Sequence, residues 1–456
     1  MLLALLSLML CALLWLNGLL NSLDRPSVGN ALTLRQLQLQ FLAAPALPTT
    51  LRPLLSGEDP AKSLADELEQ QLALDPGPGR PDQLLQLALL RRQQGDTTAA
   101  RGLFDQLASQ VPPQQRLLLT VLADSDTDGG VGGLDQGESR QLMASWEAAA
   151  SPVSRQLICR NLVTDADACI DLRLQRNAVL RLFGVSWLPV LLVLAGTALL
   201  VRELWLLWRG RRVLSPILGP DLNLVDVTLL IAGGFVVLGE LTVPLVLLPA
   251  SQTLLAPLSG SPIRQQGVQV LLLYLGLMAP PLLILRAQLA STATLPPAGG
   301  WLQWCWRPLK SGLRQAMSQV LMVLPLVALA GLLVERLVGD PGGSNPLLEL
   351  VLTAGDPLAL FCFAVTAMVL APLFEETLFR GVLLPVLARH WGPPIAVLMS
   401  ALVFGLAHLS LGELVPLLVL GVGLGWLRLR TGRLAPCVLM HGLWNGFTFL
   451  NLVLLA

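Results

Sequence analysis

Of the 456 residues in this chain, 54% are hydrophobic and only 13% are charged, whereas a soluble protein carries about 25% charged residues. This composition excludes a soluble globular protein and predicts a polytopic membrane protein. The formal net charge is zero, so no excess of basic residues favours a nucleic acid as partner.

About nine apolar segments have the length that a helix needs to cross a lipid bilayer. The first, residues 1–20, has no Lys or Arg before it and no clear cleavage site after it, which favours a signal anchor over a cleaved signal peptide. The other segments are 183–208, 226–250, 268–286, 316–334, 357–388, 393–411, 413–427 and 434–455. We therefore predict an all-α fold, a polytopic transmembrane helical bundle of about nine spans in the cell membrane.

The basic residues of the short loops concentrate on one side of this bundle. The loops of that side hold Arg202, Arg209, Arg211, Arg212, Arg286, Arg307, Lys310, Arg314, Arg389, Arg428, Arg430 and Arg433. The intervening loops hold only Arg264 and Arg336. Because Lys and Arg are enriched in cytoplasmic loops, the basic side is predicted to be cytoplasmic and the long polar segment 21–181 to be an extracytoplasmic α-helical segment.

The polar segment contains one pattern typical of a tetratricopeptide repeat. The residues with that spacing are Leu87, Ala88, Gly95, Ala100, Phe104 and Pro112. They predict two antiparallel helices broken at Gly95, with Ala100 allowing close approach and Phe104 filling the groove. Such a repeat would offer a site for a protein partner. A single repeat cannot bury its own face, so an unrelated helical hairpin is an equal alternative.

Farther along, an acidic stretch fits the spacing of a calcium-loop pattern at Asp124, Asp126, Asp128, Gly129 and Asp135. The last position holds Asp in place of the usual bidentate Glu, and an acidic, Gly-rich turn explains the same residues.

Only two of the six cysteines, Cys159 and Cys169, lie in the polar segment. An oxidising compartment would favour a disulfide between them. No CxxC or Cys/His zinc spacing occurs in the chain.

The three His residues differ in their surroundings. His390 lies beside Arg389 at a predicted cytoplasmic turn and is expected to be a surface residue. His408 and His441 lie within predicted spans, where a lone His is as readily a hydrogen-bonded core residue as a functional one. Their depths favour function, because Glu375 lies at a matching depth.

The midpoint of the turn at 390–393 is equally far along the chain from Glu375 and His408. In two antiparallel helices these residues therefore lie at the same depth, up to roughly 25 Å from that turn. Counted from the next cytoplasmic turn, at 428–433, His441 and Asn445 lie roughly 16 to 23 Å deep and share one helix face. Polar groups from three spans are thus expected in one layer.

Such a layer suits hydrolysis. A carboxylate beside an imidazole, Glu375 with His408, can hold a water and accept its proton. A second imidazole and an amide, His441 and Asn445, supply donors for an oxyanion. The alternative is a structural polar cluster.

The neighbouring charges are expected to have another role. Glu375 and Glu376 lie about 100° apart on a helix, so only one can face this centre. Glu376 and Arg380 are spaced i, i+4, which predicts an ion pair that balances charge and fixes the helix.

The ordered motifs Glu-Glu-x-x-x-Arg (375 to 380), Phe-x-x-x-His (404 to 408) and His-x-x-x-Asn (441 to 445) resemble the CAAX-protease and bacteriocin-processing family of intramembrane endopeptidases, which includes the type II CAAX prenyl endopeptidases. The resemblance covers roughly residues 350–456. It implies that this membrane core hydrolyses peptide bonds of membrane-associated proteins or peptides. The catalytic residues implied are Glu375, His408, His441 and Asn445, with Glu376, Arg380 and Phe404 in support.

The resemblance leaves the metal open. The family has been described both as metalloproteases and as glutamate proteases, so a divalent ion such as zinc is a candidate cofactor. The chain lacks the helical His-Glu-x-x-His motif that would make a zinc site explicit. Composition divides the rest of the chain into a signal anchor at 1–20, the extracytoplasmic segment at 21–181 and spans at 183–340. The resemblance adds a catalytic core at 350–456.

Two other classes of function remain alternatives. A catalytically silent membrane scaffold would use the polar segment to recruit partners, but the complete catalytic-type set of residues disfavours it. A transporter is suggested by Glu240, an acid within a predicted span. No inverted repeat supports transport.

Overall fold

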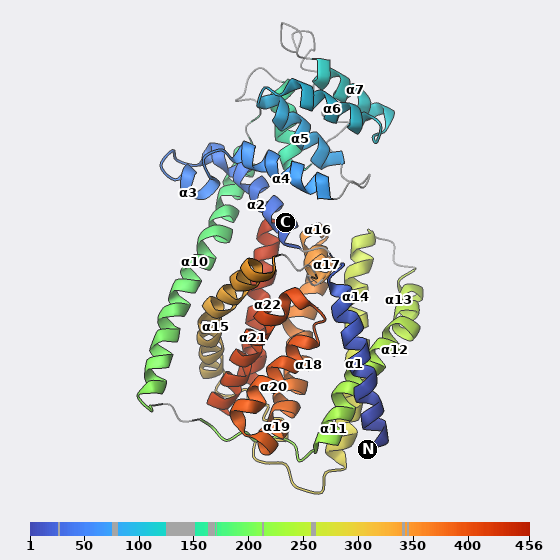
Figure 1. Ribbon diagram of the computed structural model, residues 1–456, viewed down its shortest axis with the longest axis vertical. Helices are drawn as coiled ribbons and strands as arrows, with labels where there is room; N and C mark the ends of the chain where they lie inside the picture. Colours follow the sequence, from blue (N-terminus) through green and yellow to red (C-terminus); the bar gives the residue numbers. More distant parts are fainter. Residues whose placement is uncertain are drawn as a thin grey trace. The chain divides into compact units, whose positions relative to one another are not determined.

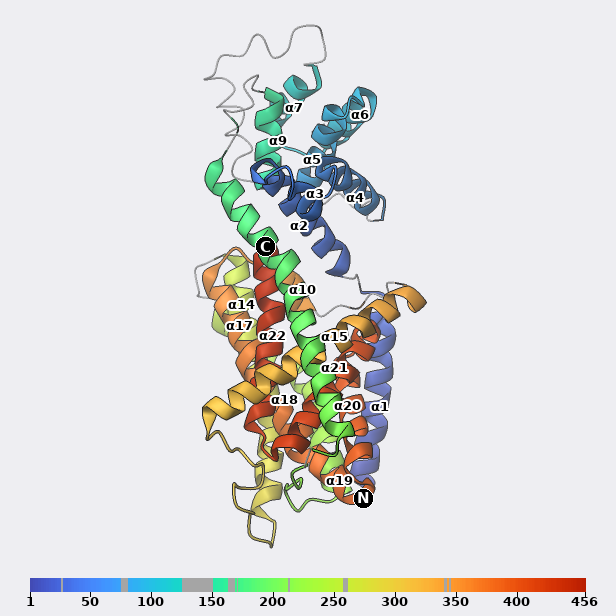
Figure 2. The same cartoon turned by 90° about the vertical axis from the view of Figure 1, so that its left-hand side faces the viewer.

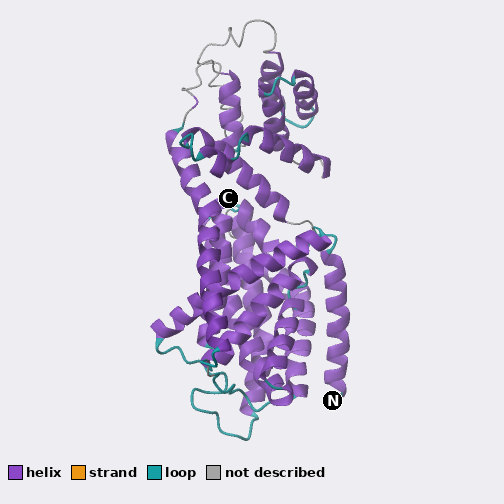
Figure 3. Cartoon of the chain, turned by 60° about the vertical axis from the view of Figure 1, so that its left-hand side comes forward, coloured by secondary structure: helices purple, strands orange, loops and turns teal. Residues whose placement is uncertain are grey.

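The computed structural model describes residues 1–25, 28–74, 81–124, 151–162, 169, 171–211, 214–256, 261–339, 343 and 346–456. These residues form helices and no strand, which confirms the predicted all-α class (Figure 3). The chain divides into two compact units. We call residues 1–28 with 189–454 the membrane unit and residues 29–188 the polar unit.

Eight helices among the described residues are long and apolar enough to cross a membrane, as expected for an integral multi-pass membrane protein (Figure 1). Those that are α-helical throughout are α1 (Leu2–Ser22), α10 (Leu172–Trp208), α14 (Pro262–Ala290), α15 (Leu309–Val338), α21 (Leu411–Thr431) and α22 (Ala435–Leu455). The others, Leu224–Leu255 and Pro357–Trp391, combine several helical segments.

The segment expected as a full span at 393–411 is shorter than predicted. It forms α20 (Pro393–Leu406), whose 14 residues are only about 21 Å long. The helix stops there because Leu409 adopts a left-handed conformation, with φ 51°, and Ser410 begins the next helix as its N-cap. His408 consequently lies in a turn at the end of α20.

The two composite spans contain π-helical segments. The first runs through α11 (Leu224–Thr228), η3 (Leu229–Val237), α12 (Leu238–Thr242), η4 (Val243–Leu247) and α13 (Leu248–Leu255). The second runs through α17 (Pro357–Val365), η5 (Thr366–Leu370), α18 (Ala371–Glu376), η6 (Thr377–Leu383) and α19 (Leu384–Trp391). The segments η4, η5 and η6 each end two residues before a proline, which lacks the N–H that continues the hydrogen-bond ladder. The short α18 thus lies between two π-helical segments.

The core of the membrane unit surrounds α18. Phe374 and Phe404 are buried among side chains from α14, α15, α21 and α22. α20 and α21 lie side by side (Figures 1 and 2), and Gly421 permits this because a Cβ there would come within 2.9 Å of Ala401. This packing brings the hairpin that carries His408 against the helix that carries Glu375. The short α16 (Pro346–Thr353) precedes α17.

The polar unit is a helical domain with its own buried core. Its helices are α2 (Val28–Ala43), α3 (Arg52–Ser56), α4 (Pro60–Leu74), α5 (Pro81–Gln93), α6 (Thr97–Ala108), α7 (Pro113–Asp124) and α9 (Pro152–Leu162), with a 3₁₀ turn at Ala44–Ala46 and the first part of α10.

The predicted hairpin is present as α5 and α6. Gly95 breaks it at φ 86°, and Ala100 and Phe104 are buried between its helices and their neighbours. The Asp96 side chain caps α6 by accepting a hydrogen bond from the Ala99 N–H, which holds the pKa of that carboxyl below its ordinary value.

The predicted disulfide between Cys159 and Cys169 is present and confirms that prediction. Of the calcium-loop pattern, only the backbone of Asp124, at the end of α7, is described. Asp126, Asp128, Gly129 and Asp135 lie outside the described residues.

The polar unit is expected to lie outside the cytoplasm, because its disulfide suits an oxidising compartment and the sequence predicts that the basic loops are cytoplasmic. An alkaline phosphatase fusion near residue 150 should be active, and one near residue 310 inactive. The reverse pattern of activity would contradict the predicted orientation.

Candidate active site

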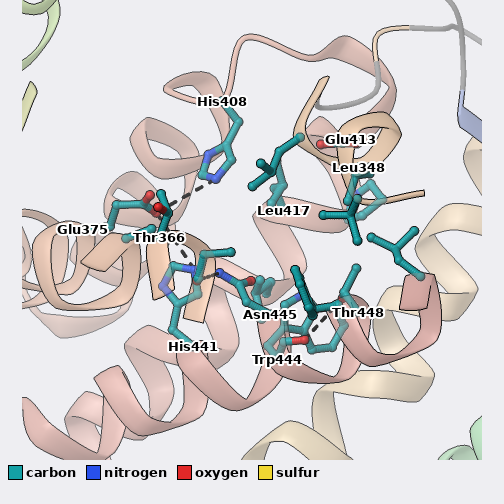
Figure 4. Close-up of a pocket in the computed structure, with 18 of the residues that line it drawn as sticks. Leu348, Thr366, Glu375, His408, Glu413, Leu417, His441, Trp444, Asn445 and Thr448 are labelled. Atoms are coloured by element: carbon teal, nitrogen blue, oxygen red, sulfur yellow. Dashed lines mark hydrogen bonds and ion pairs between the residues drawn. The ribbon is translucent and has the colours of Figure 1, made fainter. Parts of the chain in front are cut away.

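The four residues predicted to be catalytic line one cavity of about 580 Å³ (Figure 4). Glu375 comes from α18, His408 from the turn after α20, and His441 and Asn445 from α22. The predicted assembly of polar groups from separate helices is therefore present. The cavity continues past Leu417 and Trp444, so most of its wall is apolar. Its volume is in the range of small-molecule and peptide side-chain pockets.

One carboxylate oxygen of Glu375 accepts a hydrogen bond and the other does not. The Tyr274 hydroxyl on α14 donates a hydrogen bond of 3.1 Å to Oε1. Oε2 is buried and has no hydrogen-bond partner among the described residues. A buried carboxylate oxygen without a donor is costly, so this atom calls for a ligand such as water.

His408 presents one ring nitrogen to that open oxygen. Its Nδ1 lies 2.8 Å from the carbonyl oxygen of Phe404. A carbonyl can only accept, so the proton of the neutral ring lies on Nδ1. The unprotonated Nε2 then faces Glu375 Oε2 at 4.0 Å.

His441 is oriented in the same way by a different acceptor. Its Nδ1 lies 3.0 Å from Glu376 Oε1, which leaves Nε2 facing Glu375 Oε2 at 3.9 Å. The same Glu376 oxygen accepts a hydrogen bond of 2.8 Å from Arg380. Glu376 and Arg380 are fully buried, so the predicted ion pair is present. It also orients an imidazole of the site.

Two imidazole nitrogens and a carboxylate oxygen therefore converge, and all three are acceptors when both rings are neutral. Atoms 4.0 Å apart leave room for a water whose oxygen lies about 2.8 Å from each. Such a water would donate to Glu375 and to an imidazole.

The same donor set, two imidazoles and a carboxylate, is that of many hydrolytic zinc sites, but the spacing differs. Ligands around one tetrahedral zinc lie about 3.3 Å apart. The described residues contain no group of three His, Cys, Asp or Glu spaced to hold a metal ion. The separations of 3.9 and 4.0 Å fit a bound water better than a metal ion.

Asn445 reaches the cavity from one helical turn beyond His441. Its amide donates a hydrogen bond of 2.7 Å to the Ala367 carbonyl in η5. The second amide hydrogen is available for a bound substrate. Asn445 thus lies beside the cavity, as its predicted role of oxyanion donor requires (Figure 4).

Phe404 packs between the buried Arg380 and the two imidazoles of the cavity. Its ring lies edge-on to both His408 and His441, and the Arg380 guanidinium lies 4.4 Å from its centroid. Cation–π attraction helps to stabilise the buried Arg380.

The remaining polar candidates do not join this group. His390 is exposed, as predicted. Glu240 is exposed on α12 and does not line the cavity, so it lends no support to a transport pathway here.

Sequence reasoning missed Tyr274 and the contact of Glu376 with His441. Tyr274 is the only tyrosine of the chain, and a lone hydroxyl within an apolar span was a signal. The second contact was not visible because only Glu375 was expected to face the centre. Of the two carboxylates, Glu375 lines the cavity. Glu376 instead contacts Nδ1 of His441, the ring nitrogen that faces away from Glu375.

The fold and cavity define a multi-pass helical membrane protein with a buried layer of polar groups. Residues 357–447, which contain all four candidate residues, match the family model of the type II CAAX prenyl endopeptidase Rce1-like proteins. This part of the chain therefore belongs to the CAAX-protease and bacteriocin-processing family.

Residues 29–180, nearly the whole polar unit, match a domain of unknown function, DUF8675. This match gives no support to a tetratricopeptide repeat, so the α5–α6 hairpin is better described as part of that domain. Neither a curated protein nor a solved structure matches the chain.

Proposed function

We propose that the protein is an intramembrane endopeptidase that hydrolyses peptide bonds of membrane-associated proteins or peptides. The observation that carries this proposal is the buried Glu375 Oε2, which has no hydrogen-bond partner among the described residues and faces Nε2 of His408 and Nε2 of His441. The family match of residues 357–447 supports a protease, and the geometry suggests the role of each residue.

In this mechanism Glu375 and His408 activate the attacking water. The water donates one hydrogen to Glu375 Oε2 and the other to His408 Nε2, and its lone pair points at the scissile carbonyl carbon. As the C–O bond forms, the carboxylate takes the proton. Tyr274 keeps Oε1 occupied, so the reacting oxygen is Oε2. The proton then passes to the leaving amine as the C–N bond breaks.

His441 and Asn445 stabilise the oxyanion that forms. The neutral His441 ring can only accept through Nε2, so donation requires the imidazolium form. Glu376 stabilises that cation through Nδ1. Asn445 supplies an amide N–H from the same helix face.

Comparative proteomics of membranes from cells carrying the wild type or Glu375→Gln tests the proposal and identifies substrates. New peptide termini within or beside membrane spans should be present with the wild type and absent with the variant. Equal sets of termini at equal abundance of the two proteins would favour a silent scaffold.

A chelator tests whether cleavage depends on a metal ion. If Glu375 and His408 act on water without a metal, cleavage in purified membranes should survive the chelator. Complete inhibition that zinc reverses would instead assign the two imidazoles and Glu375 to a metal-bound water.

A further inference from the structure

The turn that carries His408, residues 407–411, is in a conformation that needs support. Leu409 has φ 51°, the left-handed region that a leucine side chain disfavours. Such a residue keeps this conformation only where its surroundings hold it. The orientation of the His408 ring depends on this turn, because His408 is the second residue of the turn.

The support comes from the C-terminal end of α1 and from Arg25, three residues beyond it. The Arg25 guanidinium donates a hydrogen bond of 2.6 Å to the carbonyl oxygen of Leu409. The Leu411 N–H donates to Ser22 Oγ at 3.2 Å. The Leu409 side chain packs on Gly18, where a Cβ would lie 3.0 Å from its methyl carbons. The side chain of the strained residue and the backbone that follows it are therefore fixed by α1 and Arg25.

α1 is itself fixed to the bundle. Cys11 is buried against Ala232 and Val236, and α1 packs along η3 and α11 (Figure 1). Phe235 in η3 lies edge-on to Phe374, the residue before Glu375. Both halves of the catalytic pair thus rest on elements that α1 contacts.

We propose that α1 is retained in the mature protein as part of the active site, with Arg25 and Ser22 as positioning residues for His408. They hold the 407–411 turn so that Nε2 faces Glu375 Oε2. These residues lie outside the family-matched segment, and the inference rests on the proposed function for its effect on cleavage. Loss of α1 would leave the turn without its support and inactivate the enzyme.

The test uses the full-length protein with Arg25→Gln. Termini that depend on Glu375 should form on the order of 10- to 100-fold more slowly per protein molecule, as expected for a small displacement of a catalytic group. Arg25→Lys should recover part of the rate, because an ammonium group can donate to the Leu409 carbonyl. Asp24→Asn, a change at the exposed neighbouring residue, should leave the rate unchanged.

A measurement independent of catalysis follows the geometry directly. Diethyl pyrocarbonate modifies unprotonated His, and the rate at His408 relative to the exposed His390 can be read by mass spectrometry. Arg25→Gln should change this ratio several-fold, whereas Asp24→Asn should not. The same spectra should contain peptides from residues 1–22.

An unchanged ratio with unchanged cleavage in Arg25→Gln would overturn the positioning role, and a mature protein without residues 1–22 would overturn retention. If the wild type forms no termini that depend on Glu375, the proposed function fails, and the modification ratio still decides the inference.

Discussion

Replacing Glu375 by glutamine should abolish cleavage while leaving the protein at its normal abundance in the membrane. Glutamine keeps the size of the side chain and an oxygen that can accept from Tyr274, but it cannot take a proton from water. Loss of a general base costs roughly 10²- to 10⁴-fold in rate. The rate of formation of Glu375-dependent termini, divided by the amount of protein, measures the effect.

The other site residues should follow a graded order. Alanine at His408 or His441 should lower the rate by orders of magnitude. Asn445→Ala should leave more activity, because loss of one oxyanion donor costs roughly 10²- to 10³-fold. His390→Ala is the matched control, since this ring is exposed. Wild-type turnover by Glu375→Gln would refute the catalytic assignment.

The sequence was sufficient for the features that depend on local pattern. Long apolar runs predicted the spans, and counting residues from the turn at 390–393 predicted that Glu375 and His408 meet. That counting works although α20 ends early, since the turn continues toward the same layer. The i, i+4 spacing of Glu376 and Arg380 was enough to predict their ion pair.

Features that depend on packing between distant segments were not predictable. Tyr274 lies about a hundred residues from Glu375, and only the packing of α14 against α17 and the following segments brings them together. The contact of Arg25 with the Leu409 carbonyl joins residues 384 positions apart in the sequence. The left-handed Leu409 could not be anticipated, because leucine gives no signal for that conformation.

Glu376→Ala should reduce the abundance of the protein before it affects the chemistry. Arg380 is fully buried and pairs with Glu376 at 2.8 Å. Its other contacts, the Gly421 carbonyl at 3.2 Å and the Phe404 ring, do not replace a counter-charge. Unpairing a buried charge costs about 3–5 kcal/mol, a large part of the stability of a typical domain. Quantitative immunoblotting of membranes would measure the loss, with the exposed Glu240→Ala as the control in another span.

Replacing both members of the pair should restore abundance better than either change alone. Glu376→Gln with Arg380→Met removes the two buried charges together and keeps side chains of similar volume, which is often neutral for stability. If the double variant were less abundant than both single variants, the buried pair would not be the structural unit inferred here.

The double variant should nevertheless remain a poor enzyme. The glutamine that replaces Glu376 could still accept from His441 Nδ1, so the ring would keep its orientation. An amide carries no charge, however, and cannot stabilise the imidazolium that the oxyanion requires. We expect normal abundance with cleavage at least tenfold below the wild type, since each tenfold corresponds to about 1.4 kcal/mol of lost transition-state stabilisation. Wild-type cleavage by the double variant would limit Glu376 to balancing Arg380, whereas low cleavage at full abundance would give this carboxylate a second role, that of activating His441.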